Sequence, residues 1–483
     1  MSTPTTWGGP PDMSAWEALM WRAESDPRTR STGILLEILD AEPDWDRFVA
    51  GHERTTGRIP RLRERVVEPS VPLVQPAWAP DPHFDLAHHV HRTHLAGPGT
   101  HRQLLDVCES LFRRPLDRAR PPWEAILVTG LEHGRAAYLL KFHHSLTDGL
   151  GLIQLLTLAH STTPEASSAD PEVPAPAGVA LTPTSLLASR VTARVAGAPG
   201  SAVRRWGWAI GRLGRGVRRP DEAVGTGIAF AASLRRMLAP PQAGRSPLLS
   251  GGGLGNRLLT VDFPLDRLRA GGKAAGGSVN DAFIAAVLGG MRRYHEHHGA
   301  LVDVLPIGIP VSLRNDSDPL GGNRFAGARF AAPLAEQDPA VRIQLVRDFV
   351  LAAREEPAIG FLDYLSPVLT KLPTAAIVEL SASLTVTSDL QVSNIRGIGH
   401  PVYLAGVKVL GMYPLGPRPG VAGMIAMITY DGVCCLGLNV DPDVFGDGDV
   451  LTRCLEEGFA EVAALGDGPD AVAPAGTHSS AGA

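Results

Sequence analysis

The sequence predicts an α/β protein built from two domains, for three reasons. The chain has 483 residues, which is too long for one ordinary hydrophobic core and suits two domains of about 200 residues each. Apolar strand-like segments alternate with helix-like segments in both halves. Between the halves, residues 163–183 are rich in proline, alanine and serine, a composition typical of a linker. We expect an N-terminal domain (1–160), a linker or crossover (161–225), a C-terminal domain (226–465) and a disordered tail (466–483).

Composition narrows the class of protein. With 44% hydrophobic and 20% charged residues the chain is a globular protein, and its net charge of -5 argues against general nucleic-acid binding. The four cysteines show no metal-binding spacing, which favours a reduced, cytoplasmic setting. The first residues lack the apolar core of a signal peptide, and no uncharged apolar run approaches membrane-spanning length. We therefore expect a cytoplasmic protein.

The first half opens with a helix whose start carries a capping box. Ser14 can accept a backbone N–H, Glu17 stands three residues later, and apolar residues follow. Apolar residues 33–39 then predict a strand, and residues 44–54 a helix with one polar face. The elements expected next are a helix at residues 101–112 and a strand at residues 123–129.

The stretch Lys-Phe-His-His-Ser-Leu-Thr-Asp-Gly, residues 141–149, is the candidate site. It follows an apolar run with the length of a buried strand and precedes a helix. Because side chains alternate along a strand, only one of His143 and His144 can face a given cavity. Histidine is well suited to take a proton from a hydroxyl at neutral pH. Asp148 could contact the imidazole or pair with a distant arginine, and Gly149 would permit close approach of a substrate.

Two other interpretations of these histidines stand beside the catalytic one. A histidine that hydrogen-bonds a carbonyl inside the core is commoner than a catalytic one. A metal site of His143, His144 and Asp148 would need a further ligand group, and none is evident. The histidines at positions 83–94 match no structural zinc spacing. We expect no metal.

The second half carries a further polar pair at the start of a helix. Ser278 can cap this helix, with Asn280 and Asp281 in its first turn. The carboxamide of Asn280 could donate to a developing oxyanion, whereas Asp281 is equally well explained as a partner of the helix dipole. The other elements expected here are strands at 302–313, 325–330, 384–392, 402–410, 421–430 and 433–440, and helices at 225–238, 341–355 and 450–464.

Residues 190–219 form a basic segment, in which arginines recur with no acidic residue among them. Apolar residues, including Trp206, return at three- and four-residue steps, although several glycines weaken the helix. Such a segment could lie on an anionic membrane or lipid-droplet surface. The alternative is a basic crossover between the domains.

Several motifs, taken together, resemble one family. His-His-x-x-x-Asp-Gly at residues 143–149 resembles the active-site signature of CoA-dependent acyltransferases and condensation domains. Residues 115–124, which include Trp123, resemble the proline-leucine-tryptophan segment of the bacterial wax ester synthase/diacylglycerol acyltransferase family, although Pro-Pro-Trp stands here. The other matching blocks begin at Asn280-Asp281, at Pro310 to Arg314, at Gly322-Asn323-Arg324 and at Ser393-Asn394. They follow the family order from about residue 13 to about residue 465.

The resemblance implies two domains, each like chloramphenicol acetyltransferase, with an active-site tunnel between them. It implies that His144 acts as general base on a lipid alcohol, either diacylglycerol or a long-chain alcohol, which attacks acyl-CoA to give triacylglycerol or a wax ester. Asn280, Ser393 and Asn394 become candidates for holding the oxyanion, with Asp281 and Trp123 as further substrate-binding candidates. Acyl-CoA would be a co-substrate, and no cofactor is implied.

In the wider superfamily the aspartate of this motif pairs with an arginine. Residues 58–65 are densely cationic, and from them we choose Arg63 as the partner of Asp148, although a solvated surface would also explain them. A second functional reading is an acyltransferase for a specialised metabolite or glycolipid, with a carrier protein as acyl donor. A third is a non-catalytic lipid-binding protein, which would have no need of the proton-transfer residues. The sequence leaves the oligomeric state open.

Overall fold

The computed structural model describes residues 7–71, 74–165, 181–190, 192, 244–312, 314, 320–323, 325–355, 370, 372–385 and 388–467. The basic segment beyond residue 192, the helix expected at 225–238 and the tail beyond residue 467 lie outside the described residues.

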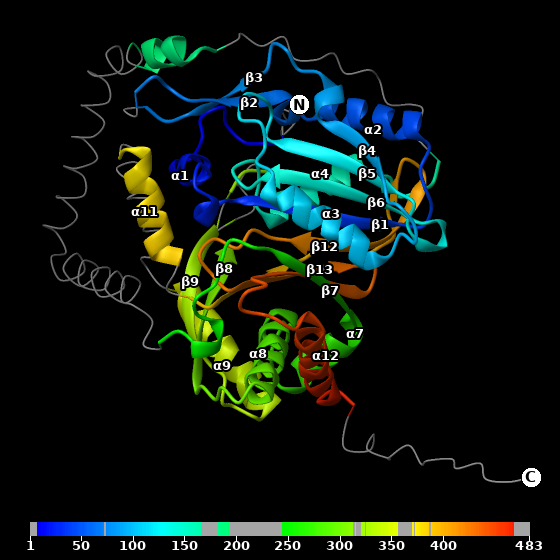
Figure 1. The fold of residues 1–483 in the computed structure, drawn as a ribbon, viewed down its shortest axis with the longest axis vertical. Coiled ribbons are helices and arrows are strands. Elements are labelled where there is room, and N and C mark those ends of the chain that lie inside the picture. Colours follow the sequence, from blue (N-terminus) through cyan, green and yellow to red (C-terminus); the bar gives the residue numbers. More distant parts are fainter. Residues whose placement is uncertain are drawn as a thin grey trace, which may run out of the picture.

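Two six-stranded sheets form the framework of the molecule (Figure 1). The first has the order β11-β12-β1-β6-β5-β4, and the second β7-β14-β13-β10-β8-β9. Both are mixed, because β4 runs parallel to β5, and β10 runs parallel to β8 and β13. The strands of the first sheet are β1 (Thr32–Leu39), β4 (Val90–His94), β5 (Trp123–Thr129), β6 (Ala136–His143), β11 (Tyr403–Leu404) and β12 (Val407–Leu415). Those of the second are β7 (Arg257–Pro264), β8 (Val304–Ser312), β9 (Phe325–Pro333), β10 (Leu390–Ile395), β13 (Gly423–Tyr430) and β14 (Val433–Val440).

Helices flank both sheets, which confirms the predicted fold class of mixed sheets with flanking helices. In Figure 1 the helices α7, α8, α9 and α12 gather below the second sheet. The helices of the first half are α1 (Ala15–Ala23), α2 (Trp45–Arg58), α3 (His101–Arg113) and α4 (Gly149–Ala159). Those of the second half are α7 (Leu265–Ala274), α8 (Val279–His297), α9 (Pro339–Glu355), α11 (Thr374–Thr385) and α12 (Gly448–Ala464). A hairpin of β2 (Glu64–Val67) and β3 (Ala77–Pro80) completes the first half.

The first sheet is completed by strands from the second half of the chain. β12 pairs with β1 in antiparallel register, so that Ile34 faces Leu415 across the ladder. The sequence predicted one strand at 402–410, but Ala405 and Gly406 both have positive φ and make a turn between β11 and β12. The two halves are therefore joined by a hydrogen-bonded ladder as well as by side-chain packing.

One predicted strand is wrong in its position. Residues 384–392 were expected to be a strand, whereas α11 continues to Thr385 and β10 begins at Leu390. Ile377 of α11 packs against Leu19 and Ala23 of α1, and this contact between distant helices lies outside the reach of local periodicity.

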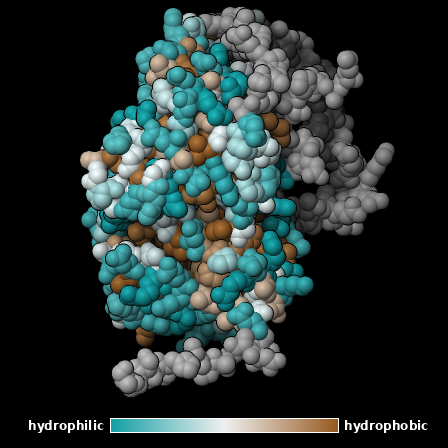
Figure 2. Space-filling model, turned by 90° about the vertical axis from the view of Figure 1, so that its right-hand side faces the viewer, coloured by the Kyte–Doolittle hydropathy of each residue, from teal (hydrophilic) through white to brown (hydrophobic). Residues whose placement is uncertain are grey.

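Two large hydrophobic clusters make up most of the buried core among the described residues, and the first of them includes side chains from both halves of the chain. The adjacent cysteines Cys434 and Cys435 of β14 belong to different cores, because neighbouring side chains point to opposite faces of a strand. All four cysteines are buried and free. Figure 2 shows apolar side chains along the band between the upper and lower halves on one side of the molecule. Within the described residues, the helices are too short or too polar to span a bilayer.

Candidate active site

The loop of residues 144–148 joins the last residue of β6 to the first residue of α4. β6 is buried along its whole length, as its apolar sequence predicts. The backbone N–H of His144 donates to the carbonyl of Ser31, at 2.9 Å, next to the start of β1. At the other end of the loop, the Asp148 carboxylate accepts the N–H of Gly151, at 2.8 Å, and so caps α4. The loop is thus fixed at both ends.

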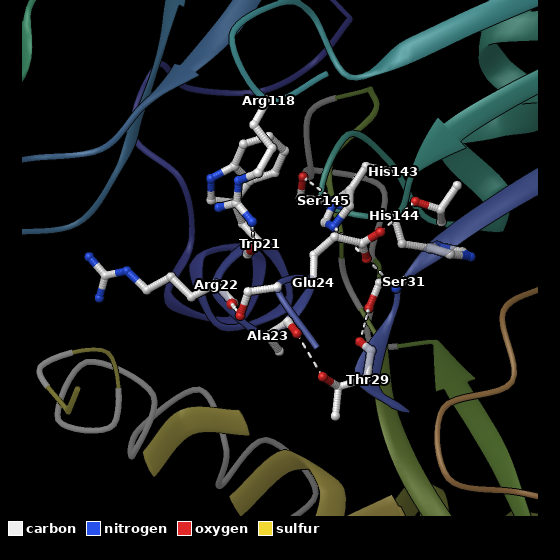
Figure 3. A network of polar contacts seen from close by, with 12 residues as sticks. Trp21, Arg22, Ala23, Glu24, Thr29, Ser31, Arg118, His143, His144 and Ser145 are labelled. Atoms are coloured by element: carbon white, nitrogen blue, oxygen red, sulfur yellow. Dashed lines mark hydrogen bonds and ion pairs between the residues drawn. The ribbon is translucent and has the colours of Figure 1, made fainter. Parts of the chain in front are cut away.

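His143 is enclosed on one side of the sheet, with only 1% of its surface exposed. Its ring meets the indole of Trp21 edge to face, with centroids 5.1 Å apart. Its Nδ1 accepts the N–H of Ser145 at 3.0 Å, so Nε2 is the ring nitrogen that carries a proton. Nε2 lies 3.3 Å from a carboxylate oxygen of Glu24 (Figure 3). We conclude that His143 is held in one orientation and one tautomer.

His144 lies in different surroundings and remains partly exposed. Its Nε2 is so close to β1 that a Cβ at Gly33 would stand 3.7 Å from it. Burial and the neighbouring His143 lower the pKa of His144 to about 4, although Asp148 opposes the shift. The imidazole is therefore neutral at pH 7 and can accept a proton.

Asp148 forms an ion pair with Arg314, which follows β8 in the second half. Nη2 of Arg314 lies 2.9 Å from Oδ2 of Asp148, and both side chains are 10% exposed. The same nitrogen donates to the carbonyls of Gly321 and Gly322, each at 3.1 Å. Arg314 therefore connects the loop of residues 144–148, which we call the histidine loop, to a segment of the second half.

The choice of Arg63 as partner of Asp148 was wrong. The guanidinium of Arg63 donates to the carbonyl of Thr56 at 3.2 Å and stands over the ring of Phe84 at 5.0 Å. The observed partner, Arg314, is 166 residues from Asp148 in the sequence. Its signal was the block at residues 310–314, which ends in arginine but does not by itself specify a partner.

Residues 320–323, which belong to the second half of the chain, contact the histidine loop. Gly322 forms a parallel bridge with Thr147 and accepts the N–H of Asp148 at 3.1 Å. The carboxamide of Asn323 donates to the carbonyl of His144 at 2.8 Å. Sequence reasoning matched Asn323 to a family block without giving it a role, because only the fold brings it to His144.

The oxyanion candidates Asn280 and Asn394 lie together. Nδ2 of Asn394 donates to Oδ1 of Asn280 at 3.3 Å, and both residues are partly buried. Asn394 precedes Ile395, and a Cβ on Gly149 would stand 2.7 Å from Cδ1 of that isoleucine. Ile395, the residue after Asn394 on β10, therefore packs against Gly149, the first residue of α4.

Ser393 and Asp281 are neighbours of this pair in sequence but differ in surroundings. Ser393 precedes Asn394 on β10, so the two side chains point to opposite faces of the strand. Asp281 accepts the backbone N–H and the hydroxyl of Ser278, each at 2.8 Å, which completes a capping box on α8. Arg347 lies 3.7 Å from the same carboxylate. The contacts of Asp281 are those of a helix cap.

Trp123 is a buried residue at the start of β5. It is 2% exposed, donates through Nε1 to the carbonyl of Leu62 at 2.7 Å, and stacks on His89 with centroids 4.6 Å apart. It also borders a cavity of about 130 Å³ between α2, α4 and the first sheet. Other residues around this cavity are Phe48, His52, Tyr138, Leu140 and Leu155.

Comparisons with known proteins place the chain among relatives over most of its length. The family model described as the wax ester synthase/diacylglycerol acyltransferase catalytic domain matches residues 13–283, and the C-terminal domain of the same family matches residues 321–463. A protein of Mycobacterium tuberculosis, provisionally named a diacylglycerol O-acyltransferase, is 38% identical over 453 residues, which cover 93% of this chain and 91% of the relative.

Solved structures share the fold. The wax ester synthase/diacylglycerol acyltransferase from Marinobacter aquaeolei VT8 is similar with a TM-score of 0.62 and 21% identity, over 94% of this chain and 100% of that chain. The first condensation domain of the calcium-dependent antibiotic synthetase, in complex with a substrate analogue, has a TM-score of 0.61 and 17% identity, over 95% of this chain and 96% of that chain.

Proposed function

This chain belongs to the wax ester synthase/diacylglycerol acyltransferase family, and we propose that it moves a fatty acyl group from acyl-CoA to the hydroxyl of diacylglycerol or a long-chain alcohol. The family membership predicted from the motifs is thereby confirmed. The main support for this reaction is the imidazole of His144, which is neutral and partly exposed. Hydrogen bonds from the backbone N–H of His144 to Ser31 and from Asn323 to the carbonyl of His144 hold this residue in place.

In this proposal His144 takes the proton of the acceptor hydroxyl. The alcohol oxygen attacks the thioester carbonyl carbon, and the carbonyl electrons move onto oxygen to give a tetrahedral oxyanion. When the intermediate collapses, the C–S bond breaks and the protonated imidazole returns the proton to sulfur. A thiol has a pKa of about 8.5, whereas that of His144 is about 4. The return of the proton is therefore strongly favoured.

Asn280 and Asn394 are the proposed oxyanion donors. With its oxygen turned toward Asn394, the Asn280 carboxamide directs its NH2 group away from that residue. A carboxamide N–H placed at the developing charge is worth about 3–4 kcal/mol in comparable acyl-transfer sites. We expect Asn280→Ala to lower kcat more than it raises KM.

The test of this function is an assay with a panel of acceptors. Purified protein is incubated with labelled palmitoyl-CoA and hexadecanol, diacylglycerol or a polar hydroxy compound, and both thiol release and product are followed. We expect ester product with a lipid alcohol, and a fall of about 10²–10⁴-fold in His144→Ala. His88→Ala, which changes an exposed histidine, is the matched control. Substantial turnover by folded His144→Ala would exclude this base, and product only with the polar acceptor would favour the specialised-metabolite reading.

We also propose that the basic segment 190–219 brings the enzyme to an anionic lipid surface. Its arginines and its regularly spaced apolar residues support this role. Deletion of the segment should reduce co-sedimentation with vesicles that contain anionic lipid. Unchanged co-sedimentation would reject it.

A further inference from the structure

Glu24 is a buried carboxylate at the end of α1 that the proposed reaction does not use. Its side chain is 7% exposed and points toward the end of β6 and the loop that follows, where His143 and His144 lie (Figure 3). The end of α1 does not need this side chain, because the backbone N–H of Glu24 already donates to the carbonyl of Met20. Burying a charge without partners is costly, so the contacts of this carboxylate should explain its position.

The carboxylate is bound to the start of β1. One oxygen accepts the N–H of Ser31, and the other accepts the hydroxyl of Thr32 at 2.8 Å. Burial tends to raise the pKa of Glu24, but contacts with His143 and with this strand outweigh it and lower the pKa. Glu24 is therefore ionised at neutral pH and fixes the peptide at Ser31.

From Ser31 the connection continues directly to His144. The carbonyl of Ser31 accepts the N–H of His144 at 2.9 Å, so two hydrogen bonds link the Glu24 carboxylate to the backbone of His144. This bond complements the one from Asn323, which holds the carbonyl of His144 at 2.8 Å. The peptide groups on both sides of the His144 side chain are thus anchored.

A second route runs through His143. Its Nε2 carries the proton and lies 3.3 Å from the Glu24 carboxylate, while its Nδ1 accepts the N–H of Ser145. The ring of His143 therefore bridges Glu24 and the residue that follows His144. Loss of the carboxylate would remove the Glu24 contacts with Ser31 and with His143 together.

We propose that Glu24 is a positioning residue for acyl transfer: it anchors Ser31 and His143 on either side of His144, and thereby sets the direction in which the imidazole meets the acceptor hydroxyl. The inference deepens the proposed function and rests on the role of His144 as base. General-base catalysis requires placement within about 0.5 Å, so a loosened loop costs rate even when the fold survives.

The experiment compares Glu24→Gln and Glu24→Ala with the matched control Glu68→Gln. Glu68 is also a carboxylate beside α1, but its partners are Trp21, Arg118 and Arg22, not the start of β1. We expect kcat to fall about 10–100-fold in Glu24→Ala, less in Glu24→Gln because its amide oxygen can still accept the Ser31 N–H, and not in Glu68→Gln. KM should change less than about twofold, since Glu24 contributes to the orientation of His144.

A double variant separates positioning from general damage. Glu24→Gln introduced into His144→Ala should cause no further loss of the residual rate, because there is no imidazole left to orient. An equal fold loss in both backgrounds, or a kcat of Glu24→Gln and Glu24→Ala equal to that of the control, would overturn the inference. His144→Ala alone reports on the proposed function: if it keeps its rate, the general base is wrong and the inference falls with it.

Discussion

Replacing Asp148 should destabilise the protein and slow it, because this carboxylate has two roles. It caps α4 through the Gly151 N–H, and it pairs with Arg314 from the second half. Loss of a cap costs about 1 kcal/mol. Breaking a fully buried ion pair costs about 3–5 kcal/mol. Here both side chains are 10% exposed and Arg314 keeps its bonds to two glycine carbonyls, so we take about 2 kcal/mol for the pair.

Asp148→Ala should therefore lower the free energy of unfolding by about 3 kcal/mol, which corresponds to a fall in Tm of about 6–12 °C for a domain of this size. Asp148→Asn keeps an oxygen to accept the Gly151 N–H, so it should lose only the contribution of the ion pair, about 2 kcal/mol. Both should lower kcat by about 10–100-fold, since the loop that carries His144 is displaced.

Thermal unfolding followed by circular dichroism, with kcat measured well below every Tm, tests this reasoning. Asp44→Ala is the matched control, because Asp44 caps α2 by accepting the N–H of Arg47. The control should lose about 1 kcal/mol and no activity. If Asp148→Ala is as stable and as active as Asp44→Ala, the ion pair with Arg314 does not hold the loop.

Three further results are expected. The acid limb of kcat/KM should fall near pH 4, because His144 has a lowered pKa of about 4 and must be unprotonated to act as base; a limb near the ordinary histidine pKa of about 6.5 would contradict the burial argument. Gly151→Ala should lower the stability by about 1–3 kcal/mol, measured as a lower Tm, because a Cβ there would stand 2.0 Å from the hydroxyl of Thr147 and 3.0 Å from the backbone of Gly321; an unchanged Tm would refute this close packing. Arg314→Ala should lower both Tm and kcat, whereas Arg63→Ala should leave kcat unchanged, and the opposite order would restore the pairing first chosen from the sequence.

The sequence alone determined features that depend on neighbours in the chain. The capping box of Ser14 and Glu17 is present at the start of α1, and the apolar run before the two histidines is a buried strand that ends at His143. The alternation of side chains separated His143 from His144, because the geometry of a strand repeats every two residues. Each of these features is specified within a few residues of sequence.

The tertiary structure decided how distant groups meet. Arg314 rather than Arg63 pairs with Asp148, and β12 pairs with β1 in the first sheet. The local sequence of Arg314 or of β12 does not specify these partners. The contacts of Glu24 with Ser31 and His143 were likewise absent from the sequence reasoning. A surface arginine and a buried, paired one have the same letter in the sequence. Their energies differ because burial removes water and makes each charge depend on the one partner that the fold places beside it.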